Sequence, residues 1–300
     1  MSEYKFSVVI ATFNRPELCS AAVASVFVAA ADKHCVQVVV VDDASEAQLP
    51  CFENPHVRVF MQENNAGPGS ARMRGIREAA GLLVVILDDD DELRVDAFDT
   101  LSTRLAELSD NDWLVAQFAT SNARPTLKFH RLMFDHYMAE RVAGDYTPVF
   151  HRERFLASGL TYPETRLGGE HLLWWAMSLQ IAIPTWQDVL IDVGEAAAER
   201  LTDIDSQVGR ANEHLALAEA TWHQFGTKLK NQYPHQATRV LMGGITYSVL
   251  AGKRFRAFAF LVNLRAPKQV AMAVAILVLP RKAVVKLFRS FRSRQLHSAD

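Results

Sequence analysis

The sequence predicts an α/β fold: a parallel sheet with helices on both faces, followed by a mixed region and a helical C-terminal tail. Two observations support this fold class. Short apolar runs rich in β-branched residues alternate with helix-length segments through the first hundred residues. Acidic and polar residues stand directly after three of these runs, where ligands bind in open sheets of this kind.

Four parallel strands are expected in the first hundred residues, because each run is short, apolar and bounded by polar residues. Pro16 begins an Ala-rich helix that continues to about Ala31, and the turn at Gly67 begins a second helix that continues through Ala80. The four strands are Phe6–Ala11, Val36–Val41, Val57–Met61 and Leu82–Leu87.

The pattern changes after Glu92. Residues 121–164 mix His, Arg, Pro and aromatic residues without a clear period, and we expect loops and short strands there. The remaining expected elements are a helix over Val95–Leu108, a strand over Trp113–Phe118, a buried helix over His171–Ile183, and mostly helix over Leu201–Leu250.

Composition and charge limit the class of protein. The chain has 300 residues, 49% of them hydrophobic, which is typical of a globular protein. Its three cysteines form no C-x-x-C pair, and no signal-peptide pattern precedes the first strand, so we expect a cytoplasmic protein. Residues 221–300 carry 14 Lys and Arg and one acid, a net charge of +13, whereas the remainder carries −15. A basic tail of this kind suits an anionic surface.

The tail is expected to consist of two segments on either side of Pro280. Residues 270–279 are apolar but supply only about half of the ~20 residues that a membrane-spanning helix needs. Beyond Pro280, apolar residues at helical spacing alternate with cations, which predicts a helix lying on a membrane surface. A core-packed helix with solvated cations is the alternative. The apolar residues are Val284, Val285, Leu287, Phe288 and Phe291, and the cations are Lys282, Lys286, Arg289, Arg292 and Arg294.

The acidic run Asp88–Glu92 is the sharpest chemical signal in the sequence. Converging carboxylates repel one another, and a divalent cation removes that cost. Oxygen ligands suit Mg²⁺ or Mn²⁺, and a metal held by few carboxylates keeps positions for diphosphate oxygens. A solvated acidic helix N-terminus is the alternative, because acids are favourable there too.

The motifs after the strands resemble the successive blocks of family 2 glycosyltransferases, which have the GT-A fold. The resemblance covers about residues 5–100 and is specific, because four motifs occur in order at normal spacing. They are Phe6 to Arg15, Val40 to Ser45, Asn64 to Ile76, and Leu87 to Asp91.

The resemblance implies a donor site for a nucleotide sugar. Asp88-x-Asp90 would be the D-x-D motif, with Asp90 as the direct metal ligand and Asp88 facing ribose or metal; the register Asp89-x-Asp91 stays open. Asp42 or Asp43 would accept a hydrogen bond from the base. Residues two apart on a helix cannot point the same way, so we expect at most one of Arg72 and Arg74 to touch the donor. The other implied donor-binding residues are Thr12, Asn14, Glu17 and Asp89.

A second block, Tyr162 to Trp174, resembles the acceptor side of the same family. The family usually has Gly-Glu-Asp there, and the Asp is commonly the catalytic base. This chain has Gly169, Glu170 and His171, so a histidine stands where the carboxylate is expected. Either His171 takes the proton, or Glu170 does, or the pocket has lost its base; a histidine with an ordinary pKa near neutrality is a competent base. Alternatively, Glu170 caps the helix that follows.

The resemblance thus implies an inverting, Mn²⁺- or Mg²⁺-dependent transfer from a nucleotide-diphospho-sugar, expected to be a UDP-sugar, to a glycan or lipid-linked hydroxyl group in cell-envelope polysaccharide or glycolipid synthesis. We expect a peripheral protein on the inner face of the membrane and no nucleic-acid partner. The alternative is a non-catalytic nucleotide-sugar or glycan-binding protein, and a nucleotidyltransferase is disfavoured because no glycine-rich loop follows the first strand. The expected organisation is a nucleotide-sugar-binding half at 1–105, an acceptor-binding half at 106–200 and a helical region at 201–300.

Overall fold

The computed structural model describes residues 4–31, 34–109, 112–123, 131–139, 142, 145–194 and 204–297. The chain divides into two compact units, residues 1–197 and 198–300. Some features expected from the sequence lie outside the described residues. They are the boundary at residue 200, part of the expected loop region, including residues 124–130, and the side chains of Arg292 and Arg294. The division of the first 200 residues into two halves stays a prediction.

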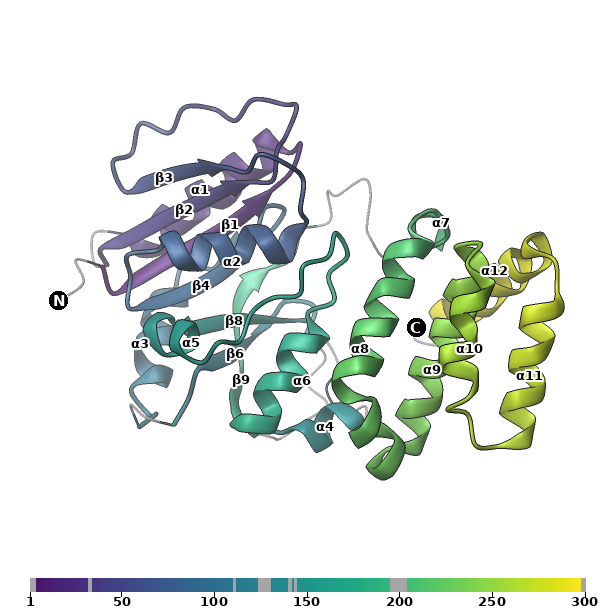
Figure 1. Ribbon diagram of the computed structural model, residues 1–300. Helices are drawn as coiled ribbons and strands as arrows, with labels where there is room; N and C mark the ends of the chain where they lie inside the picture. Colours follow the sequence, from purple (N-terminus) through teal and green to yellow (C-terminus); the bar gives the residue numbers. More distant parts are fainter. Residues whose placement is uncertain are drawn as a thin grey trace. The chain divides into compact units, whose positions relative to one another are not determined.

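The first unit contains a sheet with the strand order β3-β2-β1-β4-β8-β6-β9-β5 (Figure 1). The first four strands in this order are parallel to one another, as the sequence predicts. In register, Thr12 lies opposite Asp42, and Ala11 lies opposite Asp88, so the polar ends of three strands form one edge. These strands are β1 (Phe6–Thr12), β2 (Val36–Asp42), β3 (Val57–Met61) and β4 (Leu83–Asp88).

The other half of the sheet is mixed, and the sequence did not predict most of it. β8 (Tyr146–His151) runs antiparallel between β4 and β6 (Val115–Thr120). β9 (Ile183–Asp192) is parallel to β6, and β5 (Glu92–Leu93) pairs with its last residues. The region expected to hold loops and short strands also contains two short helices. The remaining elements are β7 (Arg131–Leu132), α4 (Phe134–Met138) and α5 (Arg152–Ala157).

The expected helix over His171–Ile183 is wrong at its end. Helix α6 (His171–Gln180) stops before Ile181, and Ile183 is already the first residue of β9. The apolar run continues through both elements, and such a run does not itself separate a buried helix from a buried strand. The helix expected over Val95–Leu108 is α3 (Ala97–Leu105).

Helices cover both faces of the sheet, in agreement with the predicted fold class (Figure 1). Alternate residues of β1 point to opposite faces: Val8 packs in the core with α1 (Pro16–Ala30) and α3, whereas Val9 packs in the core with α2 (Pro68–Glu78) and α6. Gly75 lets α2 approach the sheet closely, because a Cβ atom there would lie 2.2 Å from Val9 Cγ1.

The second unit is helical throughout its described part. Its core joins Leu215, Leu241, Ile245, Phe260 and Ala273. The break between the last two helices falls at Leu279 and Pro280, as predicted. Across the described residues, every helix is too short or too polar to cross a membrane. The elements are α7 (Ile204–Gly209), α8 (Ala211–Gln232), α9 (Pro234–Leu250), η1 (Arg254–Arg256), α10 (Ala257–Leu261), α11 (Pro267–Val278) and α12 (Arg281–His297).

Candidate functional site

The acidic run begins at the end of β4, and its second residue is tied to the end of β1. Thr12 Oγ1 donates a hydrogen bond of 2.7 Å to Asp89 Oδ2. Arg15 Nη1 lies 3.0 Å from Asp89 Oδ1 and 3.5 Å from Asp90 Oδ2. Burial raises the pKa of Asp89, although the bonds from Thr12 and Arg15 oppose that shift. Asp89 therefore has a structural role, because it connects the end of β4 to the end of β1.

The side chains of the acidic run alternate between buried and accessible. Asp88 and Asp90 keep 48% and 21% of their side-chain surface exposed, whereas Asp89 keeps 8%. Asp91 is buried and accepts a 3.0 Å hydrogen bond from the backbone N–H of Gly194, and burial raises its pKa to about 7. A Cβ atom on Gly194 would lie 1.8 Å from the carbonyl oxygen of Asp90. The accessible pair is thus Asp88 and Asp90.

Arg72 joins the acidic run to the block that resembles the acceptor side. Its two terminal nitrogens form ion pairs with Asp88 and Glu170, and its side chain is only 11% exposed. Burial alone would lower the pKa of Arg72, but the charges of Asp88 and Glu170 raise it above its ordinary value. A permanent cation therefore lies between two carboxylates that are 82 residues apart in sequence.

Close packing explains how Glu170 reaches this position. The turn before α2 carries no side chain at Gly67, where a Cβ atom would lie 2.4 Å from the carbonyl oxygen of Thr165. Arg166 Nε donates a 3.0 Å hydrogen bond to the carbonyl oxygen of Asn65. The positive φ of 95° at Gly67 is readily adopted only by glycine. The block at 162–170 therefore rests directly on the turn that begins α2.

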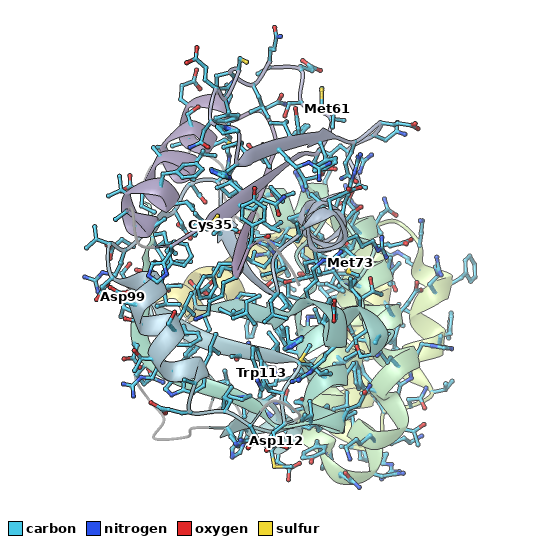
Figure 2. The ribbon with its side chains drawn as sticks, turned by 90° about the vertical axis from the view of Figure 1, so that its left-hand side faces the viewer. Cys35, Met61, Met73, Asp99, Asp112 and Trp113 are labelled. Carbon is cyan, nitrogen blue, oxygen red and sulfur yellow. The ribbon has the colours of Figure 1, made fainter. Side chains whose placement is uncertain are left out.

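Arg74 points away from this position. Its Nη1 donates a 2.6 Å hydrogen bond to the carbonyl oxygen of Met61, and its guanidinium lies 5.6 Å from the ring centre of Phe60. Both partners belong to β3, the outer strand of the sheet, and Figure 2 shows the exposed side chain of Met61 at that edge. In this structure Arg74 fastens α2 to β3, and Arg72 alone of the two lies beside Asp88.

Asp43 organises the loop that follows β3. Its carboxylate accepts hydrogen bonds from Gln62 Nε2, at 2.5 Å, and from the backbone N–H groups of Ala66 and Gly67, at 2.9 and 2.7 Å. Asp42 accepts one bond through Oδ1, from the backbone N–H of a neighbouring loop residue. Both carboxylates are buried and hold loop residues, and contact of either one with a base stays a prediction.

Asn14 has a similar structural role at the end of β1. Its φ of 55° is in the left-handed region, and its Oδ1 accepts bonds from the N–H groups of Glu46 and Ala47, at 2.8 and 3.2 Å. Phe13, which the sequence analysis did not select, exposes 42% of its surface beside it. The position of an aromatic residue directly after the apolar run Phe6–Thr12, within the polar strand end, is the sequence signal that could have found it. Glu17 is exposed on the first turn of α1.

Glu170 and His171 lie in different surroundings. Glu170 pairs with Arg72, as described, and keeps 36% of its side chain exposed. The ring of His171 packs edge-on against Trp175 with the centroids 5.0 Å apart, and Trp175 packs against Phe134. Burial lowers the pKa of His171 to about 4. His171 is therefore neutral and weakly basic near pH 7, whereas Glu170 is next to the accessible acids.

The protonation of His171 predicts a pH-dependent stability. Its pKa is about 4 in the folded state against an ordinary 6.5, so the unfolded state binds the proton first as the pH falls. We expect stability to be lost between about pH 6.5 and 4, on the order of 2 kcal/mol after allowing for partial exposure. Thermal unfolding of the wild type and of His171→Asn at several pH values checks this; parallel curves for the two would contradict it.

The accessible carboxylates at this edge of the sheet suit a divalent cation that a substrate phosphate also binds. Within the described ranges, no three His, Cys, Asp or Glu side chains are grouped as a ready-made metal site. Mg²⁺ and related ions are commonly held by one or two carboxylates together with substrate phosphates. Asp88 and Asp90, both accessible at one edge, fit that arrangement, whereas the inward-facing Asp89 and Asp91 do not.

Comparison with known proteins identifies the family. The model of "Glycosyl transferase family 2" matches residues 7–159, about half of the chain. The chain belongs to glycosyl transferase family 2. Its curated relatives include the succinoglycan biosynthesis protein ExoO of Rhizobium meliloti, 37% identical over 92 residues, which are 29% of this chain and 26% of ExoO. A second is the GalNAc(5)-diNAcBac-PP-undecaprenol beta-1,3-glucosyltransferase of Campylobacter jejuni, 31% identical over 110 residues, covering 34% and 35%. The matched segment spans about a third or less of these relatives.

Comparison of this family 2 chain with solved structures supports the GT-A fold. S. aureus TarS in complex with UDP-GlcNAc has a TM-score of 0.55 and 18% identity, over 85% of this chain and 89% of TarS. The mannosyltransferase PcManGT of Pyrobaculum calidifontis, in complex with GDP-Man and Mn²⁺, has a TM-score of 0.50 and 17% identity, over 98% and 84%. At these identities the likeness establishes the fold alone.

Proposed function

We propose that the chain is a glycosyltransferase that moves a sugar from a nucleotide-diphospho-sugar to a hydroxyl group of an acceptor. The observation that carries this proposal is the bridge from Asp88 through Arg72 to Glu170. It joins accessible carboxylates at the donor edge of the sheet to the acidic residue of the acceptor block. A diphosphate and a hydroxyl group would meet there.

Arg72 and the acidic pair, Asp88 and Asp90, would have different roles in binding the donor. Arg72 is a buried, permanently charged group, so it stabilises negative charge on the departing diphosphate. Asp88 and Asp90 would hold Mn²⁺ or Mg²⁺, and the bound ion would neutralise the diphosphate charge. UDP is our preferred nucleotide because TarS binds UDP-GlcNAc and UDP, although PcManGT binds GDP-Man.

Glu170 is the proposed catalytic base. A carboxylate next to the donor edge takes the proton of the acceptor hydroxyl group, while the hydroxyl oxygen forms a bond to the anomeric carbon. The bond from that carbon to the diphosphate oxygen breaks in the same step, so the configuration inverts. His171 is the weaker candidate because its ring packs against Trp175, whereas Glu170 lies at Arg72 beside the donor edge.

The proposed acceptor is a glycan or a lipid-linked sugar used in cell-envelope polysaccharide or glycolipid synthesis. The names of two relatives point there: one is a succinoglycan biosynthesis protein and the other acts on a sugar carried by PP-undecaprenol. A peripheral position on the inner face of the cell membrane, with α12 against anionic lipid, would bring the site to such an acceptor.

A panel of nucleotide sugars separates an enzyme from a non-catalytic binding protein of the same fold. Each sugar is titrated by calorimetry with and without Mn²⁺, and released nucleoside diphosphate is then measured. We expect one donor to bind in a Mn²⁺-dependent way and to release diphosphate. Binding without release, even after acceptors such as prenyl-diphosphate sugars are added, would favour the binding protein and contradict the proposed transfer.

A further inference from the structure

A ridge of exposed apolar side chains runs along η1 and α10 in the helical unit. Phe255, Phe258 and Val262 are 89%, 53% and 76% exposed. Their spacing of three and four residues places them on one face of the helix. The opposite face is fixed in the core, because Ala257 and Phe260 are buried there. The ridge therefore cannot turn inward without breaking the core of this unit.

Helix α11 adds to this apolar surface. It carries no charge after Lys268, and Ala273 is its buried residue, whereas Val274 and Val278 are 44% and 77% exposed. A helix that is apolar on all sides is normally covered by protein or lipid. Arg254 of η1 donates hydrogen bonds to the carbonyl oxygens at the end of α11, so the start of the ridge and the end of α11 are neighbours.

Cations surround these apolar residues. The sequence has no Asp or Glu from residue 221 to residue 299. On α12, Leu287 and Phe291 are 57% and 61% exposed and share one side of the helix. Helix α10 itself has no charged residue, but exposed cations lie at η1, after α10, and on α11 and α12; one of them, Arg256, pairs with Glu219. They are Lys253, Arg256, Arg265, Lys268, Arg281, Lys282, Lys286 and Arg289.

We propose that η1, α10, α11 and α12 form a bilayer-binding surface in which Phe255, Phe258 and Val262 insert among the lipids. The flanking cations contact anionic headgroups, which adds an attraction that depends on lipid charge and salt. The proposal rests on the peripheral location proposed above and names the part of the chain that enters the lipid. That part begins upstream of the terminal helix, which the sequence analysis selected.

Charge favours a lipid surface over the other possible partners. A second copy of this chain docking through the same face would bring two strongly cationic surfaces together, which is unfavourable. Duplex nucleic acid would neutralise the cations but would leave the phenylalanine ridge in water, since it presents backbone phosphates and keeps its bases stacked inside. An anionic bilayer satisfies both the cations and the ridge.

Co-sedimentation of the full chain with vesicles tests the proposal. The vesicles contain phosphatidylcholine alone, or phosphatidylcholine with phosphatidylglycerol. The test variant is Phe255→Ser/Phe258→Ser, and the matched control is Val28→Ser/Val95→Ser, which removes two exposed apolar residues from the other unit. We expect the test variant to lower partitioning into anionic vesicles by at least about tenfold, and the control to leave it unchanged.

Added salt is expected to weaken binding of the wild type to anionic vesicles, and neutral vesicles are expected to bind less. Equal partitioning of the test variant and the wild type would contradict the proposed insertion of the ridge into lipid. Absence of vesicle binding by both proteins would contradict it as well. Self-association of the wild type by sedimentation velocity, lost in the test variant, would assign the surface to a second copy instead. UDP release is measured on the same samples, so a failure of the proposed transfer is recognised separately from a failure of this surface.

Discussion

Replacing Asp90 by alanine is expected to lower the rate of nucleoside diphosphate release by at least about a thousandfold. Asp90 is an accessible acid at the end of a buried parallel strand, where it would hold the cation that stabilises the leaving diphosphate. The change should leave folding intact, because Asp90 is partly exposed and the contacts of Thr12 and Arg15 with Asp89 remain. Release of UDP from the preferred donor, followed against Mn²⁺ concentration, measures the effect.

A matched control is available within the same acidic run. Glu92 is exposed on β5 and pairs through its backbone with β9, so Glu92→Ala removes an acid without touching the accessible pair. We expect its turnover to stay within about threefold of the wild type, in the range of ordinary surface changes. Near-normal turnover by Asp90→Ala, or equal losses in both variants, would contradict the role proposed for Asp90.

Glu170→Gln is expected to lower kcat by about 10²- to 10⁴-fold, the usual contribution of a general base. The amide keeps the shape of the side chain but cannot take a proton, so substrate binding should change much less than turnover. His171→Asn is the matched change at the next position, and we expect it to keep kcat within about tenfold because the His171 ring packs against Trp175 and not at the donor edge.

Steady-state kinetics of both variants over a range of pH separates the two candidates. If Glu170 is the base, kcat falls in Glu170→Gln at every pH and is kept in His171→Asn. The reverse pattern would assign the base to His171 and contradict our choice. A loss of the same size in both variants, together with a lower unfolding temperature, would indicate damage to the start of α6 instead.

The first four strands could be predicted because each is a short apolar run ended by polar residues. The other half of the sheet lacks this local signal. β9 contains Pro184 and Gln187, and it follows α6 without a clear polar break, so its start at Ile183 was assigned to a helix. β5 has two residues and exists through its pairing with the end of β9, a contact between distant parts of the chain.

The candidate site shows the same division between local and long-range information. The positions of Asp88 and Asp90 at a strand end could be predicted, but their accessibility over Asp89 and Asp91 depends on partners from elsewhere. Thr12 and Arg15 supply two of those partners from the end of β1, and Gly194 supplies another from the segment after β9. Arg15 was part of a recognised motif, yet its ion pair with Asp89 needed the structure.

The most direct test of the proposed donor site is a crystal structure of the chain with a UDP-sugar and Mn²⁺. We predict the diphosphate beside Arg72 and the ion on Asp90, with Asp89 still bonded to Thr12 and the anomeric carbon facing Glu170. A nucleotide bound away from the ends of β1, β2 and β4, or an ion held by Asp89 and Asp91, would contradict it.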